Sequence, residues 1–108
     1  MKSENIAELG DDFDLQIKKG RWVVDFSAEW CNPCKVMDPH FKEAAKELKG
    51  KVNFGKVDVE SNQELSSRFE VMGIPTTIFF LDGEIVNRTV GAIDKENLIK
   101  LVRDSFNL

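Results

Sequence analysis

Cysteine and histidine are scarce in this sequence. Its 108 residues include two cysteines, Cys31 and Cys34, and one histidine, His40. Two cysteines are too few for a disulfide-rich secreted scaffold. They also cannot complete a four-ligand zinc site with one histidine in a single chain, unless carboxylates contribute. Only one disulfide can form within the chain, and no further cysteine competes for it.

Long apolar runs and clusters of positive charge are also missing. The longest apolar run, residues 78–81, is too short to span a bilayer, and residues 1–5 lack the apolar run of a signal peptide behind them. Fifteen Lys and Arg against nineteen Asp and Glu give a net charge of −4. We therefore expect a cytoplasmic protein that binds neither nucleic acid nor a membrane.

The remaining residues indicate one small domain over residues 1–108, with strands and helices in alternation. Apolar and β-prone runs predict strands over residues 6–9, 22–28, 52–59, 76–81 and 84–90. Helical spacing and capping residues predict helices over residues 11–19 and 31–48, from Ser61 to Gly73, and after the N-cap Asp94. This order predicts an α/β fold in which a mixed five-stranded sheet is flanked by four helices.

The two cysteines stand between a predicted buried strand and a predicted helix start, in the order Cys31-Asn32-Pro33-Cys34. Unpaired amides and the helix dipole stabilise a thiolate at such a position and lower its pKa. The spacing places both sulfurs within one helical turn, where a disulfide can close. We expect Cys31 to be the attacking thiolate and Cys34, which should be more buried, to resolve the mixed disulfide.

Two other roles for the cysteine pair remain open. A structural disulfide that closes so short a loop would contribute only about 2 kcal/mol. Half of a metal site shared by two chains is the other possibility, although His40 does not stand at a usual ligand spacing from Cys34. The strand-then-helix context favours a redox pair.

Several segments resemble the thioredoxin family. Residues 24–35 (Val-Asp-Phe-Ser-Ala-Glu-Trp-Cys-Asn-Pro-Cys-Lys) resemble its active-site signature, and residues 73–76 (Gly-Ile-Pro-Thr) are similar to its cis-proline loop. Residues 82–83 and 90–92 match its hairpin turn and the glycine of its substrate groove. The resemblance covers essentially the whole chain. It implies a thioredoxin fold and a protein-disulfide reductase that acts in cell redox homeostasis without a bound cofactor or metal.

The resemblance also implies catalytic roles for Asp25 and Lys56. Asp25 interrupts an otherwise apolar strand, so its carboxyl group should be paired or protonated. By the resemblance, it manages the proton of Cys34 through water, and Lys56 on the neighbouring strand is its partner. The alternative is an aspartate that faces solvent from an edge strand.

A substrate groove is a further implication of the resemblance. Its residues would be Trp30, Asn32, Pro33, Gly73, Ile74, Pro75, Gly91 and Ala92. An Ile74–Pro75 bond is usually trans when judged from sequence alone. The resemblance instead implies a cis bond that turns the Ile74 backbone toward the cysteines, where it pairs with an extended substrate chain. Core packing of Trp30 and a strand-start role for Pro75 are the alternatives.

Three residues depart from the family pattern. Asn32 replaces a glycine, Ser27 stands where some members carry tryptophan, and Met72 stands where a basic residue is often found. None of them removes the mechanism. The residues between the cysteines influence the reduction potential, so Asn32 leaves that potential and the match to a reductase open.

The resemblance therefore implies a monomer that reduces disulfide-containing protein substrates and is reduced in turn by a thioredoxin reductase. Pro33 and a cytosolic setting favour net reduction. An oxidase or isomerase is the rival within the enzyme class. A binding or assembly module that does not use its cysteines and a metal-mediated dimer are rivals outside that class.

Overall fold

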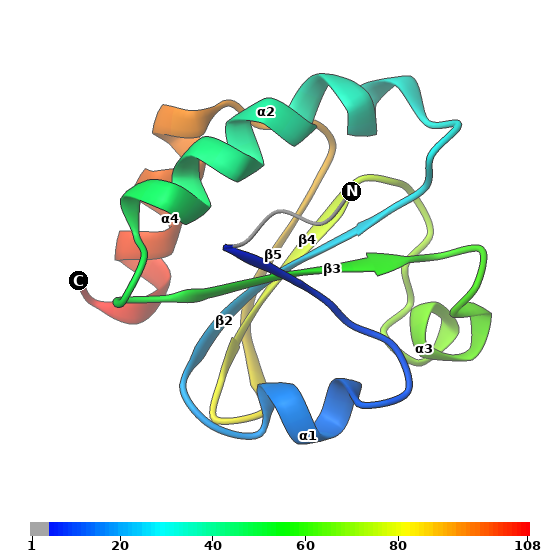
Figure 1. The fold of residues 1–108 in the computed structure, drawn as a ribbon, viewed down its shortest axis with the longest axis horizontal. Coiled ribbons are helices and arrows are strands. Elements are labelled where there is room, and N and C mark those ends of the chain that lie inside the picture. Colours follow the sequence, from blue (N-terminus) through cyan, green and yellow to red (C-terminus); the bar gives the residue numbers. More distant parts are fainter. Residues whose placement is uncertain (1–4) are drawn as a thin grey trace.

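A five-stranded mixed sheet forms the centre of the computed structural model, which describes residues 5–108 (Figure 1). The strands, in the order β1-β3-β2-β4-β5, are β1 (Ile6–Glu8), β2 (Arg21–Ser27), β3 (Asn53–Asp58), β4 (Thr76–Leu81) and β5 (Glu84–Val90). The helices are α1 (Phe13–Ile17), α2 (Asn32–Glu47), α3 (Gln63–Arg68) and α4 (Lys95–Phe106). The predicted α/β fold is confirmed. Residues 1–4, part of the segment judged not to be a signal peptide, lie outside the described residues.

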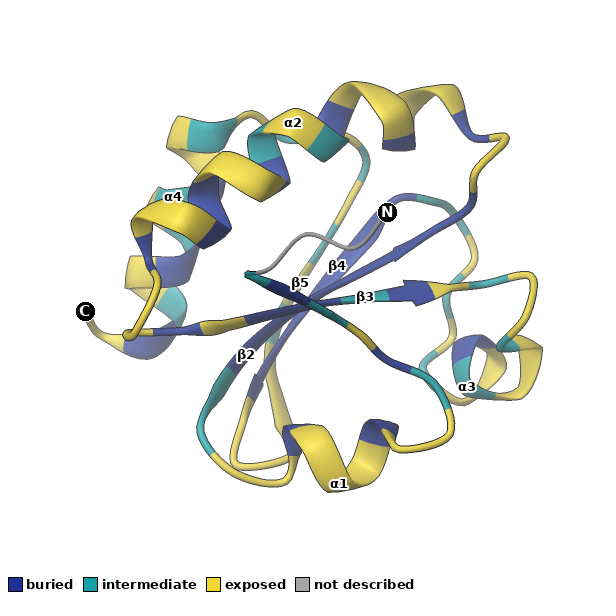
Figure 2. Ribbon diagram, viewed as in Figure 1, coloured by how far each residue is buried: buried dark blue, intermediate teal, exposed yellow. Residues whose placement is uncertain are grey.

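Strand β2 occupies the middle of the sheet. It pairs in parallel with β3 and antiparallel with β4, and every residue after Arg21 is buried. Helices α2 and α4 cover one face of the sheet, whereas α1 and α3 cover the other (Figure 1). Burial on both faces is the reason that β2 is a nearly continuous apolar run. Exposed residues gather on the outer sides of the helices (Figure 2).

Successive side chains of β2 point to opposite faces of the sheet. Val23 belongs to the core beneath α2 and α4, whereas Val24 and Phe26 belong to the core beside α1 and α3. By this alternation, Asp25 shares the face of Val23. The strand therefore directs a carboxyl group toward the layer that carries the cysteines.

The predictions for α3 need two corrections. The N-cap is Asn62 and not Ser61. The Asn62 side chain makes no capping hydrogen bond, so the predicted capping box does not form. The helix ends at Arg68, well before Gly73. Glu70 adopts a left-handed conformation with φ of 54°, and the amides of Glu70 and Val71 donate to the last turn. This Schellman-type closure ends the helix without a glycine.

Two capping and turn predictions are confirmed. Asp82 and Gly83 both have positive φ, as the tight turn between β4 and β5 requires. The Asp94 side chain accepts a hydrogen bond from the Asn97 amide at the start of α4. No helix formed by residues 5–108 has the length and apolar character needed to cross a membrane.

Truncation of Phe41 should destabilise the fold strongly. Phe41 is fully buried in α2, and its ring packs edge-on against Phe54 of β3, with ring centroids 5.2 Å apart. We expect Phe41→Ala to lower the free energy of unfolding by about 3–5 kcal/mol. The matched control is Val36→Ala on the exposed side of the same helix, where the side chain is 62% exposed. Denaturant unfolding measures both variants, and equal losses would contradict this account of the core.

Candidate redox site

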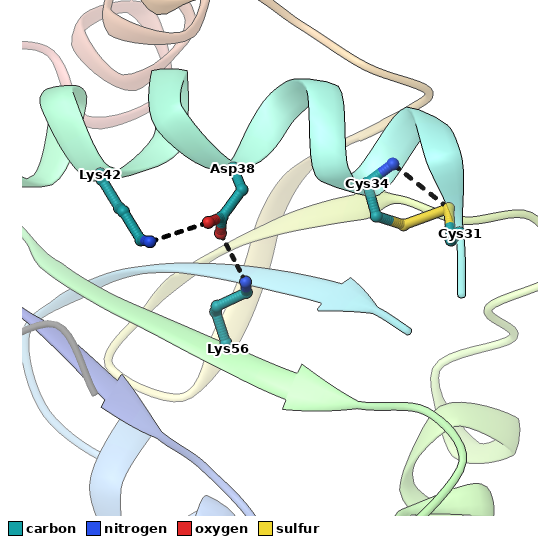
Figure 3. A network of polar contacts seen from close by, with 5 residues as sticks. All are labelled: Cys31, Cys34, Asp38, Lys42 and Lys56. Carbon is teal, nitrogen blue, oxygen red and sulfur yellow. Dashed lines mark hydrogen bonds and ion pairs between the residues drawn. A yellow bond between two sulfur atoms is a disulfide. The ribbon is translucent and has the colours of Figure 1, made fainter. Parts of the chain in front are cut away.

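The two cysteines form a disulfide at the start of α2 (Figure 3). Cys31 is the N-cap of the helix, and Cys34 lies in its first turn. Their Cα atoms are 5.2 Å apart, a separation typical of disulfides. Because β2 ends at Ser27, the short connection to α2 places the cysteines at the end of the central strand.

A hydrogen bond connects the helix backbone to one of the sulfurs. The Cys34 amide donates to Cys31 Sγ at 3.2 Å. This bond uses one of the amides that have no hydrogen-bond partner within the helix at its start. The positive end of the helix dipole lies at the same place. Both interactions favour negative charge on Cys31 Sγ when the disulfide is reduced. The predicted helix-start environment of Cys31 is therefore present.

The cysteines do not differ in burial as predicted. Cys31 is 4% exposed and Cys34 is 5% exposed. Both pack with Ala28 and with the partly buried Val59 and Ile74. Cys31 Sγ lies 3.7 Å from the Ile74 carbonyl oxygen, so the loop before β4 covers this sulfur. The expectation that Cys34 is the more buried cysteine is wrong for the disulfide form.

The loop before β4 brings several predicted groove residues to the cysteines. The Ile74–Pro75 peptide bond is cis, as the resemblance implied. The Gly91 amide donates to the Pro75 carbonyl at 2.8 Å, which joins this loop to the end of β5. Gly73 approaches the same strand end, because a Cβ atom on it would lie 3.4 Å from Val90.

The other predicted groove residues lie at the surface beside these segments. Trp30 is 62% exposed, which excludes the core-packing alternative for its side chain. The remaining exposed members of the predicted groove are Asn32, Pro33 and Ala92. Asn32 and Pro33 begin α2, and Ala92 follows Gly91. The surface beside the disulfide is therefore mostly apolar, and Asn32 is its polar member.

Asp25 is buried beneath this site, with only 1% of its surface exposed. Its neighbours across the sheet are Lys56 on β3 and Thr77 on β4. Within the described residues, Oδ1 of Asp25 has no hydrogen-bond partner. Burial raises the pKa of Asp25 to about 7. The positive charge of Lys56 lowers this pKa, and the negative charge of Asp38 raises it, but both effects are smaller than that of burial. The alternative of a solvent-facing aspartate on an edge strand is wrong.

Lys56 pairs with a residue that the sequence analysis did not identify. Its Nζ lies 2.6 Å from Asp38 Oδ1, and Lys42 Nζ lies 2.9 Å from the other carboxylate oxygen (Figure 3). Burial raises the pKa of Asp38, but its hydrogen bonds to Lys56 and Lys42 outweigh this effect and hold the pKa below its usual value. The sequence did contain a signal for Asp38: it follows Cys34 by four residues, and residues with this spacing lie on the same face of a helix.

A cavity of about 800 Å³ adjoins the same residues. Its lining includes Cys34, Asp38 and Lys56, together with Ser27 at the end of β2. Of the two cysteines, Cys34 is among its lining residues. Among residues 5–108, no group of three or more His, Cys, Asp or Glu side chains is gathered as metal ligands would be. His40 instead accepts a hydrogen bond from the Lys95 amide at 3.0 Å.

A disulfide at a helix start after a central strand, covered by a cis-proline loop, defines a thiol–disulfide oxidoreductase. The comparisons with known proteins agree. The family model described as Thioredoxin matches residues 5–104. Over 91 residues, the chain is 46% identical to a thioredoxin of Staphylococcus saprophyticus and 43% identical to one of Staphylococcus aureus strain Mu50. Each match covers 84% of this chain and 88% of the relative.

The chain belongs to the thioredoxin family. It is a protein-disulfide oxidoreductase that works by dithiol–disulfide exchange through Cys31 and Cys34. The resemblance drawn from the sequence is confirmed at the level of family, fold and reaction.

Replacement of Asp25 by asparagine should change how stability depends on pH. The carboxyl pKa is 3.8 in the unfolded reference and about 7 in the fold. Well below pH 3.8 the group is protonated in both states. As the pH rises toward 7, the unfolded state releases this proton first, so the wild type loses stability. The neutral Asp25→Asn variant lacks this loss.

The stability difference between Asp25→Asn and the wild type should therefore grow, in favour of the variant, by up to about 4 kcal/mol between pH 4 and pH 8. Urea unfolding across this range measures it. A difference that stays constant with pH would show that the Asp25 carboxyl group has an ordinary pKa in the fold.

Proposed function

We propose that this protein is a net reductant of protein disulfides that acts as a single-domain monomer in the cytoplasm. The observation that carries the proposal is the hydrogen bond from the Cys34 amide to Cys31 Sγ at the start of α2. It supports Cys31 as the sulfur that carries negative charge in the reduced protein. A charged, low-pKa thiolate is the nucleophile that disulfide exchange requires.

In the first step, the Cys31 thiolate attacks one sulfur of a substrate disulfide. The substrate disulfide breaks, a bond forms between Cys31 and the attacked sulfur, and the other substrate sulfur leaves as a thiolate. In the second step, the Cys34 thiol transfers its proton through water to the Asp25 carboxylate, and Cys34 attacks Cys31 Sγ. The bond between Cys31 and the substrate breaks, and the attacked substrate sulfur leaves as a thiolate. The Cys31–Cys34 disulfide remains.

The pKa of about 7 at Asp25 supports this use of its carboxyl group. A group that exchanges protons works best when its pKa lies near the working pH. The exchange passes two electrons between sulfur atoms, so it needs no bound cofactor or metal. The oxidised protein must then be reduced by another dithiol protein, and a thioredoxin reductase is the partner we propose.

An extended substrate segment would bind along the loop that covers Cys31. Its backbone would pair with the backbone of Ile74, as in strand addition. The cis Ile74–Pro75 bond and the contact of Cys31 Sγ with the Ile74 carbonyl support this placement. The side chains and glycines beside the substrate would be Trp30, Asn32, Pro33, Gly73, Pro75, Gly91 and Ala92.

Insulin reduction in the presence of dithiothreitol tests the proposed reaction. We expect the wild type to accelerate the precipitation of insulin chains and Cys31→Ser to abolish this acceleration, because it removes the attacking sulfur. Wild-type protein that produces no acceleration would overturn the proposal. A strongly oxidising reduction potential would instead identify an oxidase or isomerase.

The matched variant Cys34→Ser separates the roles of the two cysteines. It keeps the attacking sulfur and lacks the resolving one, so it should accumulate a mixed disulfide between Cys31 and the substrate. Mass spectrometry detects this species. Accumulation in Cys31→Ser and not in Cys34→Ser would reverse the assigned order of attack.

Removal of the Asp25 carboxyl group should slow disulfide exchange. We expect Asp25→Ala to lower the rate by about 10- to 100-fold at neutral pH, because water replaces part of its acid–base role. The rate should also lose its dependence on a group with a pKa near 7. Asp14→Ala is the control, because α1 lies on the opposite face of the sheet. A rate and pH profile equal to those of the wild type would remove Asp25 from the mechanism.

A further inference from the structure

Lys56 and Asp25 stand side by side in the sheet without pairing. They are opposite each other in the parallel register of β2 and β3, and paired residues of neighbouring strands direct their side chains to the same face. Nevertheless, Lys56 Nζ bonds to Asp38 Oδ1 of α2 at 2.6 Å, and Asp25 Oδ1 has no hydrogen-bond partner in the described part of the chain. The cation nearest to Asp25 in the strand register is thus bound elsewhere.

The surroundings of Asp38 explain why it binds this cation. Its carboxylate is partly exposed, so it remains charged at less cost than the fully buried Asp25 carboxyl. Lys42, one helical turn further along α2, holds the second oxygen at 2.9 Å. In Figure 3, Asp38 points down from α2 toward the sheet and Lys56 reaches up to it from β3.

We propose that Asp38 is a positioning residue for disulfide exchange, because it holds the Lys56 ammonium group on α2 and keeps this cation from pairing with the Asp25 carboxyl group. The inference rests on the proposed function, in which Asp25 exchanges a proton with Cys34. Asp38 itself touches no reacting atom in this scheme.

The charges that face Asp25 set the direction of the effect. They are Lys56 from β3 and Asp38 from α2, whereas β4 contributes the uncharged Thr77. Lys42 binds the other oxygen of Asp38. Cys34 is the titratable group one turn before Asp38. A released Lys56 would stabilise the charged form of Asp25. The carboxylate would then be a weaker base for the Cys34 thiol at neutral pH.

The test is the variant Asp38→Asn, which retains the shape of the side chain and removes its charge. Carbon-13 NMR of the side-chain carboxyl groups follows the titration of Asp25 directly. We expect the pKa of Asp25 to fall by about 1 to 3 pH units, the range for a carboxyl group that gains a neighbouring cation. The acid limb of the pH–rate profile for insulin reduction should move to lower pH in parallel. An unchanged Asp25 titration would overturn the inference.

A second background separates the release of Lys56 from the simple loss of a nearby negative charge. In Lys56→Met there is no cation to release, so the addition of Asp38→Asn should lower the pKa of Asp25 much less than it does in the wild type. Equal lowering in both backgrounds would show that Asp38 acts only as a charge, and would overturn the inference.

Lys42→Met is the matched control on α2. It removes the second partner of Asp38 but leaves the bond between Asp38 and Lys56 in place. We expect the Asp25 titration of this variant to stay close to that of the wild type. A fall as large as that in Asp38→Asn would overturn the assignment to the Asp38–Lys56 bond.

The two readouts also separate this inference from the proposed function. If Asp25→Ala slows exchange but the Asp25 titration does not move in Asp38→Asn, the inference fails and the proposed function stands. If the titration moves but Asp25→Ala reacts at the wild-type rate, the proposed proton transfer fails, and the role of Asp38 in exchange fails with it.

Discussion

The hydrogen bond from the Cys34 amide to Cys31 Sγ depends on where α2 begins. The helix can present an unpaired amide to that sulfur only because Cys31 is its N-cap, immediately after the connection from β2. Strand β2 is held in turn by strands on both sides and by helices on both faces. The start of α2 therefore follows a strand that is paired on both edges and packed on both faces.

The same central strand carries a buried acidic residue, Asp25. A carboxyl group that is almost completely buried, with a pKa near 7, lowers stability at neutral pH relative to a neutral residue. This loss of stability is consistent with a functional role for Asp25, because the residue faces the layer that contains the cysteines. Its cationic neighbour in the sheet is bound by Asp38, so the charge balance beneath the cysteines involves α2 and β3 together.

Much of the fold could be predicted because local patterns and tertiary packing agree. The apolar run in β2 and the Asp-Gly turn between β4 and β5 indicated these elements with nearly correct bounds. The prediction failed in α3, where Glu70 adopts the left-handed conformation that a glycine was expected to supply. That choice depends on the hydrogen bonds of the closing turn, which residue type alone does not reveal.

Residue type and spacing were sufficient to locate the redox pair, because a helix start acts on any sulfur placed at its N-cap. They also indicated that Asp25 is buried, because its neighbours in the strand are apolar. The partner of Lys56 could not be assigned in this way. A lysine side chain reaches several carboxylates, and the choice between Asp25 and Asp38 depends on distances and burial between α2 and β3. Those quantities exist only once the helix has packed on the sheet.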